Sequence, residues 1–145
     1  MKKYLYSWLS AFLVIFNLGY VFHEILARDF FVKNIGEISR ESYIIPYIAL
    51  SFMFYVAILV YIFPMFYAKY SSKYSPTKIG LGFGALFGFL WDGLQGGLIE
   101  VATFKMPFIV FLVDSTYHIL EGALAGLIIS IVYLKFLKKE ANMLQ

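Results

Sequence analysis

Four long apolar stretches, separated by short polar connections, dominate the chain. They lie at residues 4–27, 44–68, 79–101 and 108–134. A bilayer core about 30 Å thick takes about 20 apolar residues to cross as a helix, and each stretch meets that length. The pattern therefore predicts an all-α, polytopic membrane protein, with residues 1–145 forming a single domain built as a four-transmembrane-helix bundle.

The third and fourth stretches each carry a row of small and ionisable residues spaced four apart. The rows are Gly80, Gly84, Gly88, Asp92, Gly96 and Glu100 in the third stretch, and Asp114, His118, Gly122, Gly126 and Ser130 in the fourth. On a helix, such a row forms a ridge, and glycines along it let a second backbone approach closely. The connection near residues 104–107 is short, so the two helices should be antiparallel neighbours. We therefore predict helix-packing contacts at Gly80, Gly84, Gly88, Gly96, Gly122 and Gly126.

Composition supports the membrane class. Hydrophobic residues make up 61% of the chain and charged residues 14%, against about a quarter charged in a typical soluble domain. Lys2 and Lys3 before an apolar run also fit a signal peptide, but that run is longer than a usual signal core and no clean cleavage site follows it. We therefore expect an uncleaved first helix. Cysteine is absent, which excludes disulfides and thiolate chemistry.

The basic residues predict the orientation of the bundle. One side of the membrane is flanked by Lys2, Lys3, Lys69, Lys73, Lys78, Lys135, Lys138 and Lys139, and the other by Arg28, Lys33, Arg40 and Lys105. Because cytoplasmic flanks carry the excess of Lys and Arg, both termini are expected in the cytoplasm, with residues 28–43 outside. The net charge of +3 thus reflects topology and gives no argument for nucleic-acid binding.

A polar cluster is expected in the external half of the bundle. Asp114, His118 and Glu121 are separated by four and three residues, so they share one helix face. Ionisable groups are costly inside a membrane and should face protein or water with partners. The candidate partners are Asp92 and Gln95 on the third helix and His23 and Glu24 near the end of the first. We predict that these seven residues form a ligand or proton site.

Several interpretations of this cluster stay open. It could bind or transport a small solute, proton or lipid, which we favour. It could be the centre of a membrane-embedded enzyme, metal-dependent or not, in which His118 acts with nearby carboxylates. It could also be purely structural, in a subunit that packs against a partner through its glycines. No nucleophile is evident, so we assign no catalytic residue, no metal-ligand set and no cofactor.

Part of the chain resembles a known group of proteins. The segments 84–88, 91–92, 102–107 and 113–118, followed by Gly122, are similar to the second half of small bacterial four-helix membrane proteins classed as domains of unknown function. The resemblance covers residues 80–130 and implies four spans in a bacterial cytoplasmic membrane. We expect the lipid bilayer as its environment, a small-molecule ligand as a candidate partner, and either self-association or a partner membrane protein.

Overall fold

The computed structural model describes residues 1–36 and 44–142, except for the side chains of Asp92, Glu140 and Ala141. Most of these residues are helical. The α-helices are α1 (Lys2–Tyr20), α2 (Arg28–Ile35), α3 (Ile45–Tyr70), α4 (Pro76–Gly88), α5 (Gly97–Thr103) and α6 (Phe108–Asn142). Two π-helical segments extend them, η1 (Val21–Leu26) after α1 and η2 (Phe89–Gly96) between α4 and α5. The prediction of an all-α membrane protein is confirmed.

Among the described residues, three helical segments are long and apolar enough to cross a membrane. They are Lys2–Leu26, Ile45–Tyr70 and Phe108–Lys139, and they match three of the four predicted spans within a few residues. The fourth expected span, residues 79–101, is not one α-helix, because η2 divides it into α4 and α5. The count of four transmembrane helices is therefore not confirmed by helix length alone.

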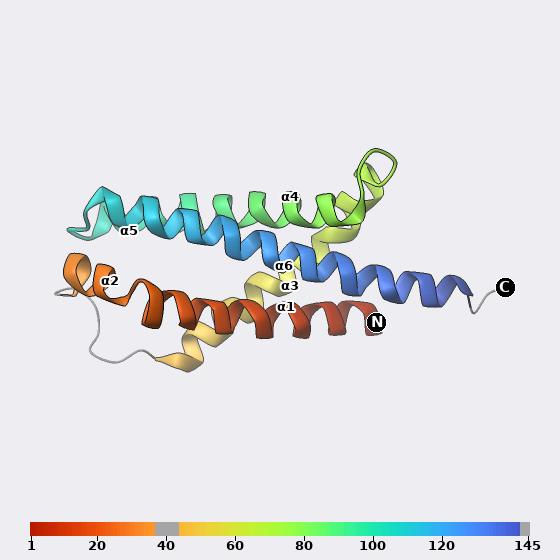
Figure 1. The fold of residues 1–145 in the computed structure, drawn as a ribbon, viewed down its shortest axis with the longest axis horizontal. Coiled ribbons are helices and arrows are strands. Elements are labelled where there is room, and N and C mark those ends of the chain that lie inside the picture. The colour runs from red at the N-terminus through yellow and green to blue at the C-terminus, as the bar shows by residue number, and fades with distance from the viewer. Residues whose placement is uncertain (37–43, 143–145) are drawn as a thin grey trace.

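Figure 1 shows how these elements are arranged. Helix α6 runs along α1 on one side and along α4 on the other, and α3 crosses obliquely behind them with contacts to all three. Both termini lie toward one end of the long axis, whereas α2 and α5 lie at the other. The chain thus passes along the bundle in alternating directions, and the expected antiparallel pairing of the third and fourth stretches is present.

The apolar core lies where α1, α3, α4 and α6 meet. Its buried centre includes Ile15 from α1, Leu59 and Phe63 from α3, Phe83 from α4 and Ile129 from α6. A membrane provides no hydrophobic drive between helices, so packing of this kind must supply much of the association through dispersion contacts. This core occupies the half of the bundle nearer the termini and leaves the polar groups to the other half.

The backbones of α4 and α6 touch along a line of glycines. A Cβ atom added to Gly84 would lie within 3.0 Å of backbone atoms of Gly122 and Gly126, and one added to Gly80 would meet the carbonyl of Gly126. Gly88 in turn faces the carbonyl of His118. We call this line of close approach, formed by Gly80, Gly84 and Gly88 on α4 against Gly122 and Gly126 on α6, the glycine seam.

Beyond Gly88 the small-residue row departs from the predicted spacing of four. A π-helix bonds i to i+5 and so inserts one extra residue into the turn. The residues that face α6 after η2 begins are therefore Gly93, against Ser115, and Gly97, against the Phe111 ring. Gly96, expected in the packing row, would meet only the carbonyl of Trp91, at 3.8 Å. The predicted packing role of Gly96 is corrected by this shift in register.

The register shift predicts unequal effects at two adjacent glycines. Gly97→Leu should destabilise the protein by about 1–3 kcal/mol, the usual cost of overpacking, because even a Cβ atom there would lie 2.5 Å from Phe111. Gly96→Leu should stay within about 0.5 kcal/mol, as surface substitutions usually do. Unfolding in mixed micelles, followed by far-ultraviolet circular dichroism, measures both. The reverse ranking would show that η2 is an ordinary α-helical turn.

Candidate functional site

The polar cluster is built on the first half of α6 and lies between the two π-helical segments. Segment η1 brings His23 toward α6, and η2 packs against α6 from the other side. The ring of Phe22 in η1 stacks on Tyr117 with centroids 4.1 Å apart, which fixes η1 against α6. π-helical turns are frequent at functional sites. Their presence on both sides of the polar cluster therefore favours the cluster as the candidate functional site.

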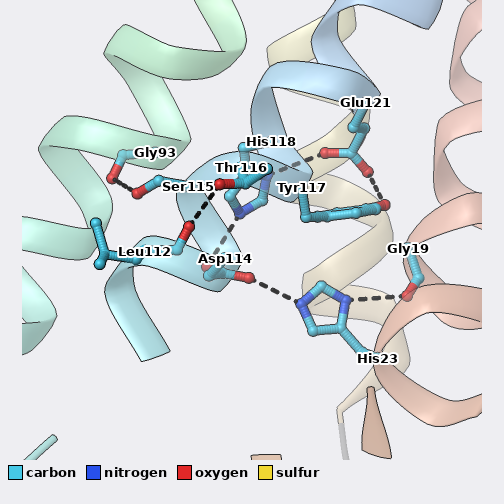
Figure 2. Close-up of polar contacts among 10 residues, drawn as sticks. All are labelled: Gly19, His23, Gly93, Leu112, Asp114, Ser115, Thr116, Tyr117, His118 and Glu121. Atoms are coloured by element: carbon cyan, nitrogen blue, oxygen red, sulfur yellow. Dashed lines mark hydrogen bonds and ion pairs between the residues drawn. The ribbon is translucent and has the colours of Figure 1, made fainter. Parts of the chain in front are cut away.

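Four ionisable side chains form one continuous network, drawn in Figure 2. His23 Nε2 lies 3.1 Å from Asp114 Oδ1, and the second oxygen of Asp114 lies 3.3 Å from His118 Nε2. The other ring nitrogen of His118 lies 3.1 Å from Glu121 Oε2. The structure therefore brings together four of the seven predicted site residues, and Asp114 bridges the two histidines.

Both ends of the network are tied to further groups. Tyr117 donates its hydroxyl hydrogen to Glu121 Oε1 at 2.5 Å, and His23 Nδ1 lies 3.0 Å from the carbonyl oxygen of Gly19. Neither partner was predicted, although each lies four residues from the group it contacts, which is the spacing of helical neighbours. We call the chain of contacts from Gly19 through His23, Asp114, His118 and Glu121 to Tyr117 the polar relay.

Hydrogen-bond accounting fixes the total number of protons in the polar relay, and therefore its net charge. The carbonyl of Gly19 can only accept, so His23 Nδ1 carries a hydrogen, and each other contact between a ring nitrogen and a carboxylate oxygen needs one hydrogen. Two doubly protonated imidazoles and two ionised carboxylates meet this requirement at every contact. The relay then has no net charge, which is the condition under which buried charges are tolerable.

Exposure falls steadily along the polar relay. The relative exposure of the side chain is 35% for His23, 22% for Asp114, 15% for His118 and 1% for Glu121. The relay is therefore accessible at the His23 end and sealed at Glu121. Beyond Glu121, toward the termini, the buried positions of α6 include Ala125 and Ile129, together with the glycine seam.

A cavity of about 590 Å³ opens beside the accessible end of the relay. It lies between α1, η1 and α3, and His23 and His118 form part of its wall. Glu24 also lines it, together with Asn17, Ser51 and the aromatic rings of both helices. Sites for small molecules typically have volumes of about 300–1,000 Å³ and mostly apolar walls with a few polar groups, and this cavity has both properties.

Of the other predicted site residues, Glu24 lines the cavity and Gln95 does not join the relay. Gln95 is exposed, and it makes no side-chain hydrogen bond to the described residues. The side chain of Asp92 lies outside the described part of the structure. Ser115, which is not among the predicted site residues, donates a 2.9 Å hydrogen bond to the carbonyl of Gly93 in η2. This bond links α6 to the π-helical segment next to the relay.

The described residues contain no group of three or more His, Asp or Glu side chains arranged to hold a metal ion. The reason is visible at His118, whose two ring nitrogens both face carboxylate oxygens. A carboxylate pair that occupies both nitrogens leaves no lone pair directed at a metal. The hypothesis of a metal-dependent enzyme centred on His118 therefore has no geometric support among these residues.

Comparison with known proteins identifies the family. No curated protein and no solved structure matches the chain. A family model described as rod shape-determining protein MreD matches residues 63–139, from the last part of α3 through most of α6. This match includes the region 80–130, so the expected resemblance to a family of unknown function is corrected to a named one. Since the match covers more than half of the sequence, the chain belongs to the MreD family of rod shape-determining proteins.

Proposed function

We propose that this chain is a multi-pass protein of the bacterial cytoplasmic membrane that takes part in determining rod shape. The family match over residues 63–139 carries this proposal. Three helices with the length and composition of membrane spans support the location. The matched region includes the glycine seam and the α6 part of the polar relay, so both features belong to the part of the chain that defines the family.

The same proposal includes four membrane crossings. The backbone is helical without interruption from Pro76 to Thr103, which exceeds the roughly 20 residues that a crossing takes, and this segment lies along α6. The two termini lie toward the same end of the bundle. Lys2 and Lys3 at one terminus, and Lys135, Lys138 and Lys139 near the other, favour the cytoplasm for that end.

Complementation tests the role in cell shape. In a rod-shaped bacterium that lacks its own MreD-family protein and has become round, expression of this chain should restore rods, measured as the length-to-width ratio of cells by microscopy. Gly84→Leu should fail to do so, since the seam has no room for a side chain. Round cells with normal amounts of the unaltered chain in the membrane would contradict the proposal.

A second candidate function, ligand binding, is favoured by the cavity. A cavity of about 590 Å³ whose wall includes two histidines of a charge-neutral relay resembles a binding site more than a packing defect. Binding is favoured over transport because the relay is accessible at one end only, and Glu121 at the other is 2% exposed. To move past Glu121, a proton or solute would have to enter the apolar half of the bundle.

A further inference from the structure

Aromatic rings form much of the wall of the cavity between α1, η1 and α3. Phe16 and Tyr20 contribute from α1, and Phe52 and Tyr55 contribute from α3. Phe16 and Phe52 meet edge to face, with ring centroids 6.0 Å apart. The faces of aromatic rings attract cations, including ammonium groups, and several rings around one space recognise quaternary ammonium ligands.

Glu24 contributes a carboxylate to the wall of the cavity. Glu24 is half-buried in its wall, and no ion pair or hydrogen bond joins its side chain to a described residue. No Lys or Arg is among the described residues that line the cavity. His23 and His118 bring positive charge, but the two carboxylates of the polar relay balance it. Among the described residues that line the cavity, this balance leaves the carboxylate of Glu24 without a compensating charge.

These observations limit the chemistry of a ligand. An anionic group would meet Glu24, and no Lys or Arg among the described lining residues would offset the repulsion. A neutral polar group would leave the charge of Glu24 unpaired in a half-buried place. An ammonium group, by contrast, would pair with the carboxylate and lie against ring faces, and an attached hydrocarbon chain would fill the apolar remainder of the cavity.

We propose that the cavity binds the ammonium group of an amphiphile through the Glu24 carboxylate and the surrounding aromatic rings. This inference rests on the proposed ligand-binding function of the cavity and adds the class of ligand. The ammonium group can belong to a membrane lipid headgroup or to a free amine, because Glu24 and the rings would recognise the same chemistry in both.

The two histidines provide a direct readout of binding. They are the only histidines in the chain, and both line the cavity, so the full-length protein labelled with ¹³C,¹⁵N-histidine in nanodiscs should give two resolvable imidazole signals. Titration with hexylamine should shift them saturably, with an affinity at least tenfold higher than that of hexanol. Hexanoate should cause no saturable shift. These probes differ only in the group presented to Glu24.

Matched variants test the carboxylate itself. Glu24→Gln should weaken hexylamine binding at least tenfold and leave hexanol binding unchanged. Asp29→Asn, which neutralises an exposed carboxylate on α2 that is not among the residues lining the cavity, should leave both unchanged. Retention of full hexylamine affinity by Glu24→Gln, or equal affinities for hexylamine and hexanol, would overturn the ammonium assignment. Absence of a saturable shift with all three probes would overturn the ligand-binding function itself.

A last comparison identifies the source of the ammonium group. Nanodiscs rich in phosphatidylethanolamine should suppress hexylamine binding relative to nanodiscs of phosphatidylglycerol if a lipid headgroup is the natural occupant. Equal hexylamine binding in the two, with the Glu24 dependence retained, would support a free amine. Both results support the ammonium class, since both require the amine to bind at Glu24.

Discussion

Gly84→Ala is expected to cost at least about 3 kcal/mol of stability, although it adds a single methyl group. The added Cβ atom would lie on backbone atoms of Gly122 and Gly126 rather than on a side chain that can rotate away. Overpacking usually costs about 1–3 kcal/mol because neighbours can yield, and here α4 and α6 would have to separate. Unfolding of the purified protein in mixed micelles, followed by circular dichroism, measures the loss.

Gly82 provides the matched control for this prediction. It lies two residues away on the same helix, and a Cβ atom there would have nothing within 4 Å. Gly82→Ala should therefore be neutral or stabilise the protein by up to about 1 kcal/mol, the difference in helix propensity between the two residues. If the two variants unfolded alike, the backbones of α4 and α6 could not be in contact at Gly84.

The spacing of residues alone was enough to place one glycine row against the other. Gly80, Gly84 and Gly88 repeat every fourth residue, as do Gly122 and Gly126, and the short connection before α6 brings the two helices together in antiparallel order. Matching depths then follow from counting residues outward from that connection. The argument succeeds over this range because both segments are regular α-helix there, with a constant 1.5 Å rise per residue.

The same counting fails after Gly88, for a physical reason. Segment η2 adds one residue to the turn, so the side facing α6 passes from Gly88 to Gly93 and Gly97 instead of continuing to Gly96. No composition cue marks a π-helical turn, because it is selected by tertiary contacts such as the bond from Ser115 to the Gly93 carbonyl. The failure of the four-residue period beside the polar relay is therefore a tertiary effect.

The candidate site could be predicted in part. Asp114, His118 and Glu121 share a helix face by spacing alone, and the contacts of His118 with the other two follow from that. The contact between His23 and Asp114 joins residues 91 positions apart, so it depends on how α1 and η1 pack against α6. Sequence gives depth along a helix but not rotation about it. For that reason His23 could be named as a candidate but not as the partner of Asp114.

The second large effect is expected from removing either member of the His118 and Glu121 pair alone. Glu121 is almost fully buried. After His118→Leu, the Tyr117 hydroxyl would be the sole hydrogen-bond donor that the relay offers to the Glu121 carboxylate. Removing one partner of a buried ion pair costs about 3–5 kcal/mol, because the other charge loses its compensation. Glu121→Leu should destabilise the protein by a similar amount, because the imidazolium of His118 would keep only one of its two carboxylate partners.

The double variant His118→Leu/Glu121→Leu should be less destabilised than the sum of the two single variants, by about 1–3 kcal/mol, as expected for residues in direct contact. Replacing both charges with apolar groups removes the desolvation cost together with the attraction. Thr116→Ala is the control on the same helix. Its hydroxyl is exposed and, among the described residues, bonds only the carbonyl of Leu112, so the change should stay within about 0.5 kcal/mol. Strictly additive losses would contradict a direct pairing of His118 with Glu121, whereas the expected non-additivity would show that these two residues of the relay are energetically coupled.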